Sequence, residues 1–266
     1  MTRQSPMQRH QLRAAALHAS QGGAQDGQQR AIQWLHTQRG HLSALQSRQA
    51  REAHKAQVLP EIEPYLRAAL EADTGQPDPI VSYAAVWALD AAAWPLALEL
   101  GAYVIRHGLA LPDEFQRNAP TLLVDLMADA ALTGRMPAAD APAHLLAALA
   151  TTQGANMPDQ TRAKAHKAIA YGLAGKTTLA GQAGSWQGLS AANLAMALEH
   201  LTRAEQLDPN VGVKKDIAAV QKLIKTTAPT TDQPPAEAEA KPPAHKAGGE
   251  GRPAPRKPAA IKRKTT

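Results

Sequence analysis

The segment Gly175-Lys176-Thr177 has the spacing that ends a phosphate-binding loop. The full pattern, G-x-x-x-x-G-K-[ST], needs a glycine at position 170, where this chain has Ala170. It also needs a buried strand before the loop, whereas residues 159–171 have the pattern of a helix. The segment therefore predicts a glycine-rich turn at the end of a helix, and no cofactor is expected there.

Two aspartates, Asp125 and Asp129, stand four residues apart and would share a helix face. A magnesium-dependent nuclease brings two or three carboxylates together, and no third acid is placed to join this pair. Glu239-Ala240-Lys241 matches the end of a restriction-type nuclease motif, but it has no strand to hold it. Both features favour solvated acidic residues over a metal site.

Other catalytic patterns are missing from the sequence. The ten histidines include no H-E-x-x-H pair, and there is no Gly-x-Ser-x-Gly nucleophile elbow. The cysteine count is zero, which excludes disulfides, thiolate metal sites and cysteine nucleophiles. An ordinary hydrolase is therefore not expected.

Positive charge is concentrated at the two ends of the chain. Residues 1–57 hold 8 Lys and Arg against 2 Asp and Glu, and residues 226–266 hold 8 against 4, whereas residues 58–225 hold 13 against 17. A body with a net negative charge does not need basic ends to fold, so they indicate attachment to a polyanion, with DNA or RNA the first candidate. Basic clusters at 162–167 and 214–215 are equally consistent with solvated faces and with phosphate contacts.

Helices are the elements that would position these residues. Aromatic residues make up 3% of the chain and alanine is abundant, which favours close-packed helices over sheet. A short helix with a basic face is expected at 6–19 and a long, arginine-rich helix across 32–56. Prolines then mark helix starts in a body that begins near Leu59 and Pro60, with helices expected at 61–72, 79–92, 95–108, 119–132, 142–150, 159–174, 188–207 and 211–225.

The expected fold class is all-α, built from antiparallel helix hairpins. Segments 96–114 and 196–214 both place Ala-Leu-Glu before a helix and a proline-containing exit, 100 residues apart, and three repeats of about 33–34 residues fit that spacing. Residues 197–210 resemble the second helix and exit turn of a tetratricopeptide unit. We expect an irregular helical bundle with one such hairpin, and a full repeat array is the alternative.

Three regions are expected: a basic N-terminal helical segment at 1–57, a helical body at 58–225 and a tail at 226–266. The tail has eight prolines, no aromatic residue and one large aliphatic residue, so it is expected to be disordered. No apolar run reaches the roughly 18–20 residues that span a bilayer, and the first residues lack the apolar region of a secretion signal. A cytoplasmic protein with no membrane partner is expected.

Five stretches carry a resemblance to a known family, in the same order as in that family. They are SPMQRH at 5–10, LPEIEPYLRAALE at 59–71, VWALDAAAWPLALELGAYVIRHGLALP at 86–112, MPDQTRAKAHKAI at 157–169 and ALEHLTRAEQLDPNVGVKKDI at 197–217. Together with the proline-rich basic tail, they resemble the small terminase subunit of temperate tailed phages with cohesive-end genomes, also described as the terminase endonuclease subunit. Residues 175–190 are richer in glycine than that family's pattern.

The resemblance implies a homo-oligomer that binds the packaging site of concatemeric double-stranded viral DNA in the cytoplasm of the bacterial host. It also implies a partner, the large terminase subunit, which carries the ATPase and the nuclease, so we expect this chain not to cut DNA alone. Arginine and glutamine can read base edges, whereas scattered lysines attract phosphates. The expected DNA-contacting residues are Gln8, Arg9, His10, Arg13, Arg48, Arg51, Lys55, Arg162, Lys164, Lys167, Lys214 and Lys215. The tail residues expected to contact DNA or the large subunit are Arg252, Arg256, Lys257, Lys262, Arg263 and Lys264.

Two other functions stay open at this point. A tetratricopeptide-like scaffold that binds only proteins would use the basic ends for solubility alone. A true nuclease would use Asp125 and Asp129. The sequence decides neither the DNA sequence recognised nor the number of subunits.

Overall fold

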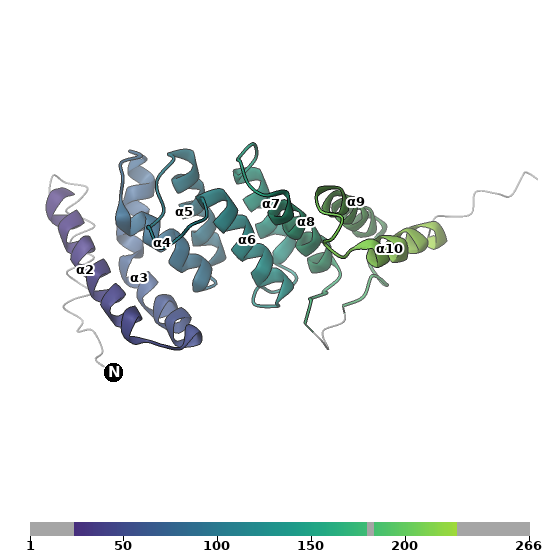
Figure 1. Cartoon of the computed structure of the whole chain (residues 1–266), viewed down its shortest axis with the longest axis horizontal. Coiled ribbons are helices and arrows are strands. Elements are labelled where there is room, and N and C mark those ends of the chain that lie inside the picture. The colour runs from purple at the N-terminus through teal and green to yellow at the C-terminus, as the bar shows by residue number, and fades with distance from the viewer. Residues whose placement is uncertain (1–23, 180–183, 228–266) are drawn as a thin grey trace, which may run out of the picture. The chain divides into compact units, whose positions relative to one another are not determined.

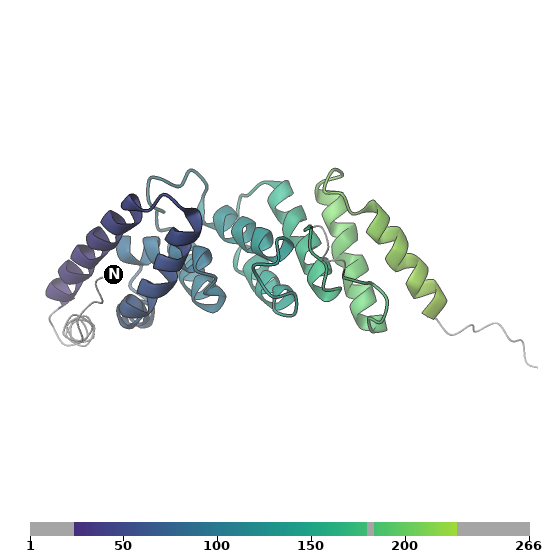
Figure 2. The same cartoon turned by 90° about the horizontal axis from the view of Figure 1, so that it is seen from below.

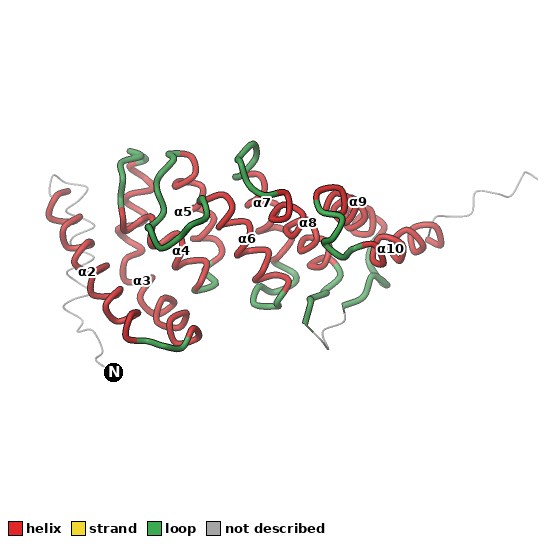
Figure 3. The backbone as a smooth tube through the Cα atoms, viewed as in Figure 1, coloured by secondary structure: helices red, strands yellow, loops and turns green. Residues whose placement is uncertain are grey.

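The computed structural model describes residues 24–179 and 184–227, and every regular element in them is an α-helix (Figures 1 and 3). The helices are α2 (Ala24–Ala44), α3 (Arg48–Ala72), α4 (Pro79–Asp90), α5 (Trp94–Arg106), α6 (Ala119–Leu132), α7 (Ala141–Thr151), α8 (Asp159–Leu173), α9 (Ala191–Leu207) and α10 (Lys214–Thr227). The predicted all-α class is therefore confirmed for this part of the chain. The helix predicted at 6–19 falls outside the described residues. Of the tail predicted to be disordered at 226–266, residues 226 and 227 belong to α10, and the rest lies outside the described residues.

Polar side chains and prolines fix where several helices begin. Asp78 accepts hydrogen bonds from the backbone N–H groups of Ile80 and Val81, and Pro79 occupies the first turn of α4. Asn118 caps α6 by the same kind of contact. From α4 onward, the helix bounds predicted from the prolines and the sequence pattern agree with the structure to within three residues.

The first two described helices differ from the prediction. The single long helix predicted across 32–56 is interrupted at 45–47, and α3 then continues without a break through Pro60 and Pro64. The predicted helix start at 61 is therefore wrong. A proline inside a helix costs about 3 kcal/mol, because a hydrogen bond is lost and the ring clashes with the preceding turn. The cost is offset by apolar side chains that α3 buries near both prolines, namely Val58, Leu59, Ile62 and Leu66.

Each helix packs against helices that are near it in the sequence. Every helix from α2 to α9 contacts the next one, and further contacts join α2 to α4, α4 to α6, α5 to α7 and α6 to α8. Figures 1 and 2 show the helices following one another in chain order. Contacts between nearest and next-nearest helices are typical of stacked helix hairpins. The similar segments 96–114 and 196–214 fall on α5 and α9, but the tetratricopeptide detail stays a prediction, as do the three predicted regions.

Small residues let these helices approach closely. Ala88, Ala97 and Ala168 have no exposed surface. A Cβ atom added at Gly101 of α5 would lie 3.1 Å from the side chain of Leu123 in α6, which is tighter than ordinary contact. Larger side chains fill the remaining space, among them Leu66, Leu100, Leu145, Ile169 and Leu201. Within residues 24–179 and 184–227, no helix has both the length and the apolar character needed to cross a bilayer.

Candidate nucleic-acid interface

The predicted basic residues of α3 have partners within the chain. Arg48 forms an ion pair with Glu52 one turn later (Nε–Oε1 2.8 Å). Arg51 donates from Nε to a backbone oxygen just after α2 (2.7 Å). Lys55 Nζ lies 2.5 Å from Asp90 Oδ2, and the lysine side chain is only 15% exposed. A phosphate would compete with these partners, most strongly at the half-buried Lys55, whereas the Arg48 side chain is 78% exposed.

Two predicted residues of α8 bind backbone oxygens of neighbouring segments. Arg162 donates from Nη2 to the oxygen of Ala155 in the connection between α7 and α8 (2.7 Å). Lys167 donates from Nζ to the oxygen of Val211, ahead of α10 (2.7 Å), beside the ring of Tyr171. Burial lowers the pKa of Lys167. Both side chains therefore have partners within the chain, and their contact with DNA stays a prediction.

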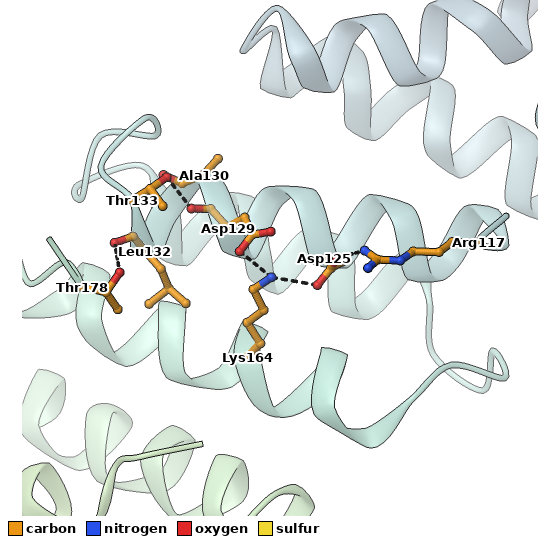
Figure 4. A network of polar contacts seen from close by, with 8 residues as sticks. All are labelled: Arg117, Asp125, Asp129, Ala130, Leu132, Thr133, Lys164 and Thr178. Carbon is orange, nitrogen blue, oxygen red and sulfur yellow. Dashed lines mark hydrogen bonds and ion pairs between the residues drawn. The ribbon is translucent and has the colours of Figure 1, made fainter. Parts of the chain in front are cut away.

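Lys164, the third predicted residue of α8, lies between two aspartates of α6 (Figure 4). Its Nζ is 2.8 Å from Asp125 Oδ1 and 2.5 Å from Asp129 Oδ1. Arg117 pairs with the second oxygen of Asp125. The lysine ammonium therefore bridges the two carboxylates that a nuclease would use for a metal ion. In the part of the chain that the structure describes, no group of three or more acidic, histidine or cysteine side chains could hold a metal.

The glycine-rich turn predicted after α8 is confirmed. Helix α8 ends at Leu173, and Gly175 follows with a φ of +63°, a left-handed conformation that favours glycine. Thr178 then binds the backbone oxygen of Leu132 at the end of α6, through its N–H (2.8 Å) and its hydroxyl (3.0 Å) (Figure 4). Lys176 pairs with Asp216, so the lysine that a phosphate loop would use is already engaged.

The carboxylate of Asp216 fixes the start of α10. It accepts hydrogen bonds from the Tyr171 hydroxyl (2.8 Å) and from Trp186 Nε1 (3.0 Å), and it pairs with Lys176. The Lys176 ammonium also lies 4.8 Å from the centroid of each of these two aromatic rings. Burial acts to raise the pKa of Asp216, but hydrogen bonds from Lys176, Tyr171 and Trp186 leave this pKa below its ordinary value. Asp216 is therefore ionised at neutral pH and anchors α10.

Beyond this anchor, α10 presents four lysines to solvent. Lys214 and Lys215 were predicted; Lys222 and Lys225 were not, and all four are exposed. None of them has a hydrogen bond or ion pair to another described residue. At about 100° of rotation per residue, the four side chains fall within an arc of about 100°, on the side opposite the fully buried Val220. We call Lys214, Lys215, Lys222 and Lys225 the lysine face.

The lysine face has a charge that nothing in its own helix cancels. The acid of α10 is Asp216, and its charge is taken up by Lys176. Unpaired lysines attract phosphates but do not distinguish bases, so this surface suits the backbone of a nucleic acid. The spacing i, i+1, i+8, i+11 could have revealed all four residues from the sequence. The predicted base-reading residues Gln8, Arg9, His10 and Arg13, and the predicted tail residues, are outside the described ranges.

Two histidines meet where α8 packs on α9; His200 is buried and His166 is half-buried. Their Nδ1 atoms, in His166 and His200, lie 2.8 Å apart. Burial lowers the pKa of His166 to about 4, and the neighbouring His200, Arg203 and Arg162 act in the same direction. Burial also lowers the pKa of His200, against an opposing effect of Glu199. Both rings are neutral at pH 7, so they add no positive charge to the candidate interface.

Comparisons with known proteins give the same family as the sequence stretches noted above. Residues 32–160 match the family described as the phage small terminase subunit. Over 228 residues, the chain is 31% identical to the "Terminase, endonuclease subunit" of Escherichia phage P2, and the match covers 83% of this chain and 86% of the relative. No solved structure matches the chain at a significant level.

Proposed function

The chain belongs to the phage small terminase subunit family, with a role in phage DNA packaging, and we propose that it is the subunit that binds duplex DNA in that process. It binds the packaging site of concatemeric viral DNA as a homo-oligomer, in the cytoplasm of the bacterial host. It then recruits the large terminase subunit, which cuts and translocates the DNA. It uses no cofactor of its own.

The lysine face is the observation that carries this proposal. Four exposed lysines on one side of α10 have no partner among the described residues, whereas the basic residues of α3 and α8 are paired. Each phosphate that a free lysine neutralises releases counterions held by the DNA, and this release favours binding. The lysine face therefore supplies affinity that does not depend on DNA sequence.

Sequence preference has to come from other residues. We assign it to the N-terminal segment with Gln8, Arg9, His10 and Arg13, because arginine and glutamine form paired hydrogen bonds with base edges. The basic residues of the tail continue the non-specific contact or dock on the large subunit.

The relative from phage P2 is named as an endonuclease subunit. We assign cleavage to the assembled complex and not to this chain alone. The reason is the position of Lys164, which bridges Asp125 and Asp129 at 2.8 and 2.5 Å and so neutralises the acids that a metal ion would need.

Fluorescence anisotropy of a labelled duplex, across a salt series with magnesium present, tests the proposal. The variant Lys214→Gln/Lys215→Gln/Lys222→Gln/Lys225→Gln is expected to lose about a hundredfold or more in affinity at low salt, and its salt dependence should be shallower by about 3 to 4 in the log–log slope. The control removes four paired arginines, Arg39, Arg48, Arg67 and Arg106, each replaced by Gln.

The control variant has the same net charge as the lysine variant, so the pair separates a local surface from a general electrostatic effect. The control is expected to retain most of the affinity, because its arginines already neutralise acids of the same chain. Equal losses in the two variants, or no loss in either, would refute the assignment to the lysine face. A duplex with the cohesive-end site and a scrambled duplex, compared on the unmodified chain, separate sequence preference from phosphate attraction.

A further inference from the structure

An open pocket of about 670 Å³ lies where α6 and α8 begin, and it shares no residue with the lysine face. Its lining includes Arg117 and Lys164 as cations, and Asn118, Thr121, Gln160 and Thr161 as neutral polar residues. Pockets of roughly 300–1,000 Å³ are the size that binds small molecules in proteins. The space therefore exceeds what a single phosphate fills and suits a group of nucleotide size.

Two hydroxyl groups in this pocket have no partner. Thr121 and Thr161 are only 6% and 7% exposed, and neither hydroxyl has a hydrogen bond to another described residue. Each threonine is the third residue of its helix, α6 or α8. Both hydroxyl oxygens remain accessible to solvent, because the buried side-chain atom without a partner in the described part of the chain is Nε2 of Gln38. Both threonines line the pocket, so their hydroxyls are available to a ligand there.

The start of α8 adds free backbone donors to the same place. Asn118 caps α6 through the N–H of Thr121, but α8 has no side-chain cap. The first turn of α8 closes only through the N–H groups of Thr161 and Arg162, which donate to Pro158 (3.0 and 3.4 Å), while those of Asp159 and Gln160 have no acceptor among the described residues. Unpaired N–H groups and the helix dipole favour an anion at such an end.

The cations of the pocket are shared with acids of the same chain. Arg117 and Lys164 both pair with Asp125, Lys164 also pairs with Asp129, and Asp159 lies in the first turn of α8. Arg117 is 57% exposed and has five N–H donors, so it keeps donors for a second acceptor after binding Asp125. The ligand would therefore meet a guanidinium edge, two hydroxyls and two backbone N–H groups.

We propose that this pocket binds the phosphate group of a nucleotide-sized phosphate ester. The phosphate lies against the uncapped start of α8, with Thr121, Thr161 and Arg117 as donors, and the remaining volume holds the attached sugar and base. The ester is either a free nucleotide or the phosphorylated end of a DNA strand. The site is independent of the lysine face and does not rest on the function proposed for it.

Titration of the full chain, labelled with ¹³C at threonine methyl groups, tests the site with thymidine 5′-monophosphate, thymidine and inorganic phosphate as probes. The monophosphate is expected to shift the Thr121 and Thr161 methyl signals, and thymidine is not. The double variant Thr121→Val/Thr161→Val keeps shape and charge, and its affinity for the monophosphate, measured by calorimetry, should fall by about tenfold or more. Arg117→Gln should weaken binding in the same direction.

The matched control is Thr133→Val at the opposite end of α6, where the hydroxyl already donates to the backbone oxygen of Asp129 (2.6 Å). It is expected to bind like the unmodified chain. Short strands with and without a 5′-phosphate then identify the source: a preference for the phosphorylated strand over the mononucleotide assigns a DNA end, and the reverse assigns a free nucleotide.

The proposal fails if the monophosphate and thymidine behave alike, or if a folded Thr121→Val/Thr161→Val variant binds the monophosphate as before. Its failure is distinguishable from that of the proposed function. The four-lysine variant should still bind the monophosphate while its duplex binding is lost.

Discussion

Helices α3–α8 and helix α10 all carry basic residues, but the two regions use them differently. In the first region the cations pair with acids or backbone oxygens of the same chain, as Lys55 does with Asp90 and Lys164 with Asp125 and Asp129. In α10 four lysines have no such partner in the described chain. A lysine or arginine on a helix is therefore not enough, by itself, to indicate a binding surface. What matters is whether another part of the fold has already neutralised the charge.

The largest effect is expected from the residue that joins the two regions. The side chain of Asp216 is only 14% exposed. Asp216→Asn removes the negative charge that pairs with Lys176, and it weakens the hydrogen bonds that Tyr171 and Trp186 donate. We expect a loss of about 3 kcal/mol in the free energy of unfolding, measured by urea titration. Hydrogen exchange should show that α10 loses protection first. Duplex affinity should fall as well, although all four lysines remain.

Asp113→Asn is the control for Asp216→Asn, since it removes the same charge from an exposed acid. Its free energy of unfolding should change by less than about 0.5 kcal/mol. An Asp216→Asn variant that keeps full protection of α10 would contradict the role of this carboxylate as an anchor.

Lys164→Met should separate stability from DNA binding. The substitution leaves Asp129 unpaired and Asp125 with Arg117 alone, so we expect a loss of about 2 kcal/mol in the free energy of unfolding. Because this lysine is already neutralised, duplex affinity should change by less than about twofold. Lys164→Arg is the control that keeps the charge. A marked drop in duplex affinity for a folded Lys164→Met variant would remove the distinction between the two regions.

Acid should weaken the packing of α8 on α9. The folded pKa of His166 is lowered to about 4, below the ordinary 6.5, so the unfolded chain binds the proton first as pH falls. Stability from this group is fully present above pH 6.5 and is lost progressively between pH 6.5 and 4, by on the order of 1 kcal/mol for a partly exposed ring. Urea titrations at several pH values measure this. In His166→Gln/His200→Gln, the same pH range should cause a smaller loss.

The smallest effect is expected from a single residue of the lysine face. Lys222→Gln should lower duplex affinity by about three- to tenfold and reduce the salt slope by about 0.9, with no change in the unfolding transition. Arg48→Gln, which removes a cation paired with Glu52, should change duplex affinity less. Anisotropy across a salt series compares the two variants directly. Identical salt slopes would mean that pairing does not decide which cations meet DNA.

The helices could be predicted from local signals, and the pairing of charges could not. Pro79 marked the start of α4 correctly, because a proline in the first helical turn is a local signal. Lys164 and Asp125 are 39 residues apart, and Lys55 and Asp90 are 35 apart, so their contacts depend on how the helices pack. The pocket between the starts of α6 and α8 could not be predicted for the same reason, because it forms only when these two helices pack. The missed residues Lys222 and Lys225 did have a local signal, the helical spacing that they share with Lys214 and Lys215.

The contacts between sequence neighbours also bear on how the chain folds during synthesis. The main contacts between described helices join an element to the first or second element after it. Little loop entropy is lost before such contacts form, so low contact order favours fast folding. A helix pair can bury its shared face while later helices are still inside the ribosome, and α10, which supplies the lysine face, is added last. The phosphate-attracting surface is therefore completed only after the helices that support it have folded.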